Sequence, residues 1–252
     1  MNHTPKQTNK TPNYEKALSV LNLEPGAPYR VLDFACGRGE FLGHLAQLVG
    51  DGAQLVGVDA KEQFIQQART ELPDIEFICD KFVDKFAFAD SSFDIVVTLD
   101  VIECIEDKAT LIDEIHRILA PGGTVLAVHW DWDSQIYAAD NQALADKITR
   151  AYSEWQQPWM DTCDGRMGRK LWGLFEGSKK FRGRADVYCL IETGYETGQY
   201  GFDNMVSLSK LVEEGGLDRA DHEQFHSELS RLNAEGRYFY SLNSFIYCGE
   251  KV

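Results

Sequence analysis

An aspartate and two glycines near the start of the chain form the pattern with the clearest chemistry. Asp33 lies in the apolar run Arg30–Phe34, and Gly37 and Gly39 follow it ahead of an amphipathic stretch. Glycines placed after a strand let the backbone approach a ligand at the strand's carboxyl end. A dinucleotide fingerprint needs a third glycine where this chain has Leu42, and a carboxylate would repel a pyrophosphate. An acid here can instead receive an ammonium group, which predicts a cofactor with an amino-acid end.

The elements that must position this acid alternate regularly along the chain. Short apolar runs predict buried strands, and apolar residues at helical spacing between them predict helices. The expected strands are Arg30–Phe34, Gln54–Val58, Ile75–Cys79, Phe93–Thr98 and Thr124–Val128, the last preceded by a Pro121-Gly122-Gly123 turn. This alternation favours one parallel α/β sheet. Asp59 ends the second strand roughly 20 residues after the glycines, where an acid can accept ribose hydroxyls.

The ordered series of motifs resembles the class I S-adenosylmethionine-dependent methyltransferases, in the branch similar to the ubiquinone/menaquinone-biosynthesis methyltransferases. The resemblance covers about residues 27–252, as a single domain. It implies a Rossmann-like, doubly wound, seven-stranded, mostly parallel sheet whose last strand is antiparallel. It also implies a helical lid inserted after the fifth strand, at about residues 134–180. Residues 1–26 are expected to form a polar tail, over Met1 to Asn13, and a lead-in helix.

The same resemblance implies that S-adenosylmethionine is the cofactor and assigns residues to its parts. Its methionine end would be held by Asp33, Ala35, Gly37 and Gly39, its ribose by Asp59 and its adenine amino group by Asp80. The adenine ring would be flanked by Ala60, Lys81 and Phe82, with Leu99 closing the pocket. Two positions depart from the family pattern. Ala35 stands where the family usually has glycine, and Cys104 stands where many relatives have histidine after Leu-Glu, here Ile102-Glu103.

Aromatic and acidic residues gather after the fifth strand, beside the expected position of the transferable methyl group. Extended residues alternate faces, so Trp130 and Trp132 would point one way and Asp131 and Asp133 the other. The rings either pack the core of the lid or form an aromatic and acidic box for an amine, with cation–π attraction of ~0.5–2 kcal/mol per contact. The expected substrate-binding residues are Trp130, Trp132, Tyr137, Tyr200 and Arg169, the last for an acceptor carboxylate. The expected bases are Asp131 and Asp133, with His129 and Glu103 behind them.

These residues favour an enzyme that transfers a methyl group in line to a small molecule, with no metal required. A small amine is the preferred acceptor, and methylation of oxygen or carbon on a phenol, an enol or a similar metabolite stays open. A non-catalytic S-adenosylmethionine-binding protein and a nicotinamide-dependent oxidoreductase also stay open. Asp33 and the missing third glycine count against the oxidoreductase.

One motif suggests a different chemistry. His222-Glu223-Gln224-Phe225-His226 matches the two-histidine zinc signature of metallopeptidases. We favour a surface helix instead, because Phe225, Leu229 and Leu232 define a buried stripe that both histidines flank.

Composition limits the partners. The chain has 252 residues and a net charge of −15, and its one short basic cluster, at 179–184, is no nucleic-acid track. No apolar run of about 18 residues is present, which excludes a membrane-spanning helix. Six scattered cysteines without a C-x-x-C pair favour free thiols and a cytoplasmic protein. The expected partner is therefore a small-molecule acceptor, with neither nucleic acid nor membrane, and the oligomeric state is left open.

Overall fold

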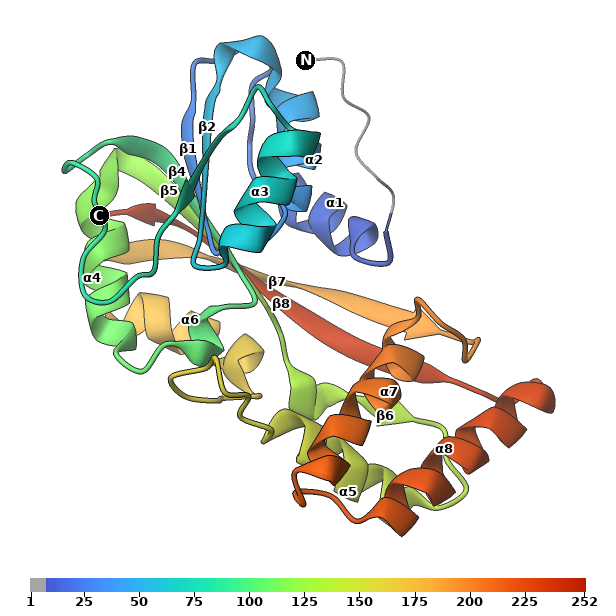
Figure 1. Cartoon of the computed structure of the whole chain (residues 1–252). Coiled ribbons are helices and arrows are strands. Elements are labelled where there is room, and N and C mark those ends of the chain that lie inside the picture. The colour runs from blue at the N-terminus through green and yellow to red at the C-terminus, as the bar shows by residue number, and fades with distance from the viewer. Residues whose placement is uncertain (1–7) are drawn as a thin grey trace.

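A mixed β-sheet runs through the molecule, as Figure 1 shows for the computed structural model, which describes residues 8–252. The strand order is β3-β2-β1-β4-β5-β8, and β7 pairs with the other edge of β8. Neighbours among β1–β5 are parallel, and β8 is antiparallel to both β5 and β7. The strands are β1 (Arg30–Phe34), β2 (Gln54–Asp59), β3 (Glu76–Cys79), β4 (Phe93–Leu99), β5 (Leu119–Trp130), β6 (Ile136–Tyr137), β7 (Phe181–Glu192) and β8 (Tyr240–Lys251).

This arrangement confirms the Rossmann-like α/β fold and corrects the strand count from seven to eight. The additional strand is β6, which pairs with Tyr240 and Ser241 of β8. These residues lie shortly before Ser244, where the segment of β8 that pairs with β5 begins. β6 therefore continues the line of β5 after a short 3-10 turn at Trp132–Ser134, which interrupts the ladder between them.

The Pro-Gly-Gly segment also differs from its prediction, since it lies inside β5 and does not precede it. Phe93 of β4 is in register with Leu119, and Ile95 is in register with Thr124. The segment at 120–123 is therefore accommodated as a bulge, in which Gly122 has a φ of +72°.

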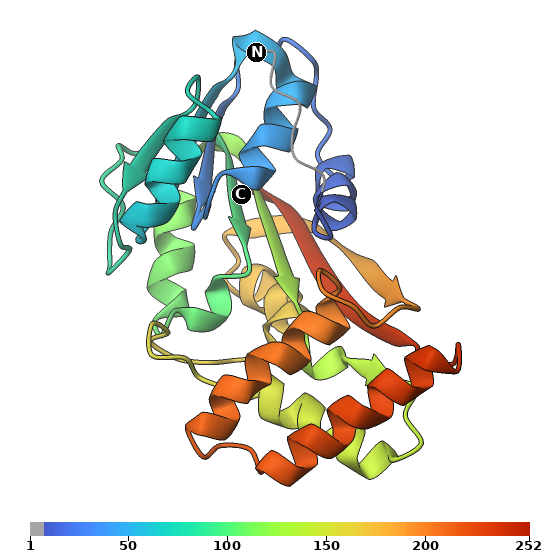
Figure 2. The same ribbon diagram turned by 45° about the vertical axis from the view of Figure 1, so that its right-hand side comes forward.

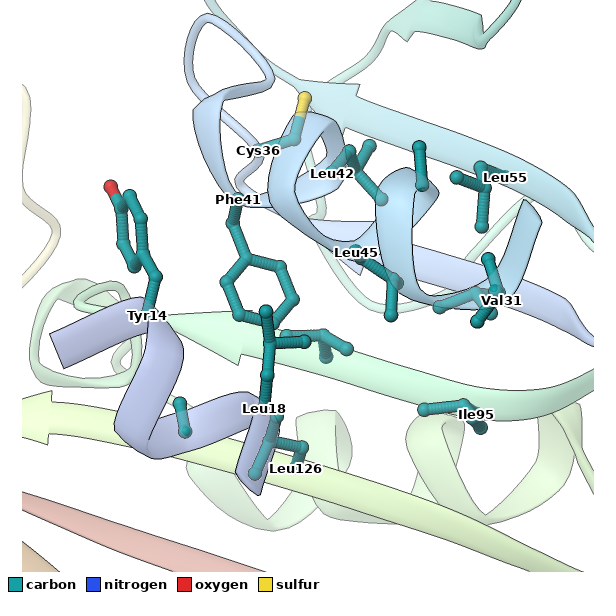
Figure 3. Packing of buried hydrophobic residues seen from close by; sticks show 14 of the residues in the cluster. Tyr14, Leu18, Val31, Cys36, Phe41, Leu42, Leu45, Leu55, Ile95 and Leu126 are labelled. Carbon is teal, nitrogen blue, oxygen red and sulfur yellow. The ribbon is translucent and has the colours of Figure 1, made fainter. Parts of the chain in front are cut away.

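Helices cover both faces of the sheet. One face carries α1 (Thr11–Ser19), α2 (Glu40–Val49) and α3 (Glu62–Glu71), whose apolar side chains pack with those of β1, β2 and β4 in one core cluster. Figure 3 shows the part of this cluster that α1 and α2 contribute. The other face carries α4 (Lys108–Ile118) and α6 (Met167–Gly177). Short 3-10 turns lie at Gly50–Gly52 and Ile102–Cys104. No helix among residues 8–252 has the length and apolar character needed to cross a bilayer.

A further group of helices lies beyond one end of the sheet: α5 (Gln142–Ser153), α7 (Tyr200–Glu213) and α8 (Arg219–Ala234) (Figure 2). They share a hydrophobic cluster with the ends of β5 and β8. The range expected for a lid, about 134–180, therefore contains two helices of different kinds. α5 belongs to this group, whereas α6 packs on a face of the sheet. α6 packs on the sheet because Leu171 and Phe175 are fully buried there, with Phe175 stacked on Tyr247. Two helices of the group, α7 and α8, come from between β7 and β8.

The polar amino-terminal segment is partly helical. Its residues 1–7 lie outside the described part of the chain, but α1 begins at Thr11, with proline in its first turn. The expected tail over Met1 to Asn13 is thus wrong for Thr11 to Asn13. Tyr14 packs edge-on against Phe41 with ring centroids 5.7 Å apart (Figure 3). α1 is thereby held against the start of α2, close to the carboxyl ends of the strands.

Candidate functional site

A cavity of about 210 Å³ lies at the carboxyl ends of β1 and β4, and we call it the Asp33 cavity. Strands contribute Asp33, Leu99 and Trp130, and the loop after β1 contributes its backbone and small side chains. Helices close the remaining sides. The lining residues are Lys10, Asn13, Tyr14, Asp33, Ala35, Cys36, Gly37, Arg38, Glu40, Phe41, Phe64, Leu99, Asp100 and Trp130.

Asp33 is the residue that defines the chemistry of this cavity. Its carboxyl group is fully buried, and neither oxygen has a hydrogen-bond partner among the described residues. Desolvation by burial, with a smaller contribution from the charge of Asp59, raises the pKa of the Asp33 carboxyl well above its ordinary range. A buried polar group without a partner is destabilising by about 1–3 kcal/mol. A bound ammonium group would satisfy both oxygens, so the residues present fit a cofactor with an amino-acid end.

The loop between β1 and α2 approaches the cavity in left-handed conformations. Ala35, Gly37 and Gly39 have φ values of +63°, +56° and +76°. A Cβ on Gly37 would meet no atom within 4 Å, so its glycine leaves open space at the cavity, whereas a Cβ on Gly39 would lie 2.7 Å from the ring of Phe77. Gly37 therefore provides access for a ligand, and Gly39 allows helix-to-strand packing. Ala35 adopts a left-handed conformation although it carries a Cβ, which is uncommon for a residue other than glycine.

Asp59 holds this loop in place. Its carboxylate accepts hydrogen bonds from the backbone nitrogen of Gly37 at 2.9 Å and from that of Lys61 at 2.8 Å. The side chain is half-buried at the end of β2 and does not line the Asp33 cavity as the described residues form it. Contact of Asp59 with a ribose stays a prediction.

The residues expected around an adenine ring have mixed positions. Ala60, Asp80 and Lys81 are exposed, and Lys81 pairs with Asp161 at 3.2 Å. Phe82 is buried in the core, where its ring lies 5.8 Å from that of Phe34 and 4.7 Å from that of Phe86. Its expected place beside adenine is therefore corrected to a place in the hydrophobic core.

A second cavity of about 190 Å³ adjoins the first, because Asp100 lines both. We call it the Glu103 cavity. Four large aromatic side chains and two carboxyl groups form most of its wall. The lining residues are Asp100, Glu103, Trp132, Tyr152, Ser153, Trp155, Gln157, Trp159, Met160 and Cys163.

Glu103 lies in the short turn after β4, and only 5% of its surface is exposed. Its Oε2 atom has no hydrogen-bond partner among the described residues. Desolvation raises the pKa of Glu103 to about 7, while His129 acts in the opposite direction. A carboxyl group with a pKa near neutrality can both hold and release a proton at physiological pH.

The structure corrects the roles expected for Asp131, Asp133 and Arg169. Asp131 is fully buried and accepts hydrogen bonds from the backbone nitrogen of Arg169 at 3.0 Å and from its Nε at 2.7 Å. Asp133 accepts one from Arg166 Nε at 3.0 Å, and this bond lowers the pKa of Asp133. Both carboxylates are thus neutralised by arginines at the start of α6, and neither lines the two cavities formed by residues 8–252. Arg169, which they engage, is not free to bind an acceptor carboxylate.

His129 lies directly behind Asp100. The imidazole is fully buried, and its Nδ1 lies 2.7 Å from the backbone oxygen of Trp130 and 3.6 Å from Asp100 Oδ1. Its Nε2 has no partner among the described residues. His129 does not line either of the two cavities, so its expected role as a base is replaced by a contact with Asp100.

The aromatic residues expected to bind substrate fall into two groups. Trp130 lines the Asp33 cavity and Trp132 lines the Glu103 cavity, with their ring centroids 6.3 Å apart. Tyr137 and Tyr200 are buried in the helical cluster, where Tyr137 contacts the ring of Tyr240 and Tyr200 contacts that of Trp130. These two tyrosines support the site from behind and do not line it.

Several lining residues were missed by sequence reasoning. Asn13 and Tyr14 were assigned to a tail or a lead-in helix, although the proline of the first turn signals a helix start. Tyr152, Trp155 and Trp159 were not assigned to the site. Asp100 carried a usable signal, because it directly follows a buried strand at the ligand-binding edge of the sheet.

The two histidines of the zinc-like motif are engaged in packing between helices. His222 Nε2 lies 2.8 Å from the backbone oxygen of Met205, and His226 Nδ1 lies 2.7 Å from the hydroxyl of Tyr195. Within residues 8–252 no group of three or more histidine, cysteine or acidic side chains is arranged to hold a metal ion.

The fold is that of a Rossmann-like domain, and the Asp33 cavity lies at the carboxyl ends of its parallel strands. Residues 32–127 match a family model described as a methyltransferase domain. A demethylmenaquinone methyltransferase of Chlorobaculum parvum is 36% identical over 94 residues, which are 37% of this chain and 38% of that protein. An uncharacterized 37.1 kDa protein of a Streptomyces fradiae transposon is 32% identical over 144 residues, or 53% of this chain and 41% of that one.

The YcgJ protein of Bacillus subtilis shares the fold, with a TM-score of 0.57, 18% sequence identity and coverage of 96% of this chain and 97% of that one. The chain spans about two-fifths of the length of the curated relatives named above. The methyltransferase match over residues 32–127 and the shared fold support a class I S-adenosylmethionine-dependent methyltransferase, as the sequence predicts.

Substitution of Asp59 tests how the loop contributes to cofactor binding. Because Asp59→Ala removes the charge-assisted hydrogen bond to Gly37 of the loop, together with the one to Lys61, we expect the affinity for S-adenosylhomocysteine to fall by about 2 kcal/mol, roughly thirtyfold. Isothermal titration calorimetry measures the change. His222→Ala, on the distant helix α8, is the control and should bind like the unmodified protein. Equal affinity of Asp59→Ala and the unmodified protein would exclude this role.

Proposed function

We propose that the chain is an S-adenosylmethionine-dependent methyltransferase that methylates the nitrogen of a small amine bound in the Glu103 cavity. The observation that carries the proposal is the wall of this cavity. Four aromatic side chains, from Trp132, Tyr152, Trp155 and Trp159, surround a space that also receives the carboxyl groups of Asp100 and Glu103. Aromatic faces and carboxylates both attract cations. The lining therefore suits an ammonium ion better than it suits an anion.

The connection between the two cavities supports the same function. Asp100 lines both, so a ligand in the Asp33 cavity and one in the Glu103 cavity would be neighbours. The cofactor, when bound, supplies a methyl group activated on a sulfonium. The protein then has to orient the acceptor and keep water away from it, and orientation alone accounts for several kcal/mol of rate enhancement in such reactions. Burial of Trp130 and Trp155 at the walls serves this purpose.

A second candidate is carbon methylation of a phenol-like or quinol-like ring. It is favoured by the names of relatives, among which is the demethylmenaquinone methyltransferase of Chlorobaculum parvum. Flat aromatic walls also accept a neutral ring by stacking. The two carboxyl groups in the wall favour the amine, since they would be desolvated beside a neutral acceptor without compensation.

The experiment that separates the candidates uses a charged ligand and its neutral counterpart. Choline and its uncharged carbon analogue dimethylbutanol have nearly the same shape, and their binding changes the fluorescence of the cavity tryptophans. We expect choline to bind about tenfold more tightly, in line with cation–π and carboxylate attraction. Methyl transfer from labelled cofactor to a panel of small amines and phenols then identifies the acceptor class. Equal binding of both probes, with transfer to phenols alone, would overturn the amine proposal.

A further inference from the structure

We propose that Glu103 is the group that pairs with the ammonium form of the acceptor and takes its proton before methyl transfer. This inference rests on the proposed function and assigns the proton-accepting role to a residue that the sequence analysis placed behind Asp131 and Asp133. Glu103 is placed by the backbone that follows β4. The turn Ile102–Cys104 directs it from the carboxyl end of β4 into the Glu103 cavity, among Trp132, Tyr152 and Trp155.

The hydrogen bonds of the surrounding acids leave Glu103 as the available carboxyl. Asp131 and Asp133 are bound by Arg169 and Arg166, as described above. Asp164 accepts two bonds from Lys170 Nζ, at 2.9 and 2.6 Å. Asp100 accepts one from the backbone nitrogen of Trp130 at 2.8 Å, which uses one of its oxygens at the junction of the cavities. By contrast, Oε2 of Glu103 has no partner among residues 8–252, and it is buried at the wall of the cavity.

The charges around Glu103 leave it close to half-ionised at neutral pH. Desolvation is the largest influence, and the carboxylates of Asp100 and Asp164 also disfavour its charged form. His129 and a hydrogen bond from Trp132 favour it. The neutral groups that face it are the thiols of Cys104 and Cys163 and the hydroxyl of Tyr152, whose own pKa values are raised by burial. The resulting pKa of about 7 suits a group that must accept a proton and then return it to water.

The step balances without any further reactant. An N–H bond of the ammonium breaks and an O–H bond forms on Glu103, which leaves a neutral amine and a carboxylic acid. The freed lone pair of the nitrogen forms a bond to the methyl carbon, while the carbon–sulfur bond of the sulfonium breaks and its electron pair stays on sulfur. The product is a methylated ammonium ion, and Glu103 releases its proton to water when that ion leaves.

The test uses Glu103→Gln, which keeps the shape of the side chain and removes its charge. Choline is the probe, because its quaternary nitrogen has no proton to lose and any pH dependence of binding comes from the protein. For the unmodified protein we expect the affinity to fall about tenfold between roughly pH 8 and pH 6, as Glu103 becomes protonated. Glu103→Gln should bind about tenfold more weakly at the upper pH and lose most of this pH dependence, although Asp100, whose pKa is also raised by burial, stays in the wall.

A matched control is Glu106→Gln, the same substitution at an exposed position three residues along the same loop. It should retain the affinity and the pH dependence of the unmodified protein. Urea unfolding checks the fold of Glu103→Gln. Stability that comes from the protonated carboxyl is lost as the pH rises through about 7, so the substitution should raise the unfolding midpoint more at about pH 8 than at about pH 5.

The outcomes distinguish this inference from the proposed function. If choline binds no better than dimethylbutanol, the amine function itself is wrong. If choline is preferred but Glu103→Gln keeps the pH dependence of the unmodified protein, another group carries the proton and this inference alone is overturned. Once an amine acceptor is known, the kcat of Glu103→Gln should be reduced by about a hundredfold or more relative to the unmodified protein, and its pH profile should be flattened.

Discussion

Replacing Asp33 with asparagine should weaken the binding of S-adenosylhomocysteine by about 2–5 kcal/mol, roughly thirtyfold to several thousandfold, and at the same time stabilise the ligand-free protein. Both effects have one origin. The Asp33 carboxyl is fully buried, and neither oxygen has a hydrogen-bond partner among the described residues. An ammonium group in the Asp33 cavity would compensate the carboxylate, and without it the protein carries the cost of desolvation. Asparagine carries no charge, so the substitution removes both the desolvation cost of the carboxylate and its attraction for the ammonium group.

The pH dependence of this variant has a definite sign. Burial raises the pKa of Asp33 in the ligand-free protein, so its protonated form is favoured and stability is lost as the pH rises through the raised pKa. The stabilisation of Asp33→Asn should therefore be larger at high pH than at low pH. The affinity of the unmodified protein should fall on acidification, because a protonated Asp33 cannot pair with an ammonium group, and that of Asp33→Asn should be less sensitive to pH.

Calorimetric titration and urea unfolding of the same samples measure the two effects. Asp94→Asn serves as a control, since Asp94 lies at the amino end of β4 and pairs with Arg30, away from the Asp33 cavity. It should leave the affinity unchanged. Loss of affinity together with loss of folded structure would show that Asp33 acts in folding, and unchanged affinity in a folded Asp33→Asn would remove it from the cofactor site.

The cofactor half of the site was predictable because its signals are local. Asp33 and the glycines follow one another within seven residues, and the backbone conformations that glycine permits can be anticipated from the turn that they must form. Buried parallel strands read as continuous apolar runs, so β1 to β4 were located to within one residue, whereas only the central part of β5 was predicted. The bulge at Gly122 was read as a turn, because glycine marks both.

The acceptor half was less predictable because it depends on pairs far apart in the sequence. Alternation along the extended segment placed Asp131 on the opposite side from Trp130, but it could not reveal that Arg169 lies 38 residues along the chain and binds it. Phe82 follows a strand end as an adenine contact would, yet its ring completes a cluster with Phe34. The expected lid range also contains α6, which packs on a face of the sheet and is not part of a lid. The amphipathic pattern of α6 shows that it buries one face but not which partner covers that face.

The ion pair of Asp131 and Arg169 leads to the second large prediction. Arg169→Met should destabilise the protein by about 3–5 kcal/mol, because Asp131 stays fully buried and keeps only one backbone hydrogen bond for its charge. The neighbouring pair offers a matched control. Arg166→Met removes the hydrogen bonds of Arg166 to Asp133, which is partly exposed and keeps an ion pair with Arg169, and should have an effect of about 1 kcal/mol or less.

Urea unfolding of both variants at neutral pH separates the two roles that Arg169 has been given. If Arg169 fixes α6 to the end of β5, Arg169→Met is much less stable than Arg166→Met, and any loss of methyl transfer follows the loss of folded protein. If Arg169 instead binds the acceptor, both variants unfold alike and only the KM for the acceptor rises. The buried Asp131 favours the first result, since an arginine committed to two hydrogen bonds with a carboxylate would have to break them to meet a substrate. Breaking these hydrogen bonds would leave Asp131 buried without a charged partner in every catalytic cycle. Arg169→Met has that unfavourable state permanently.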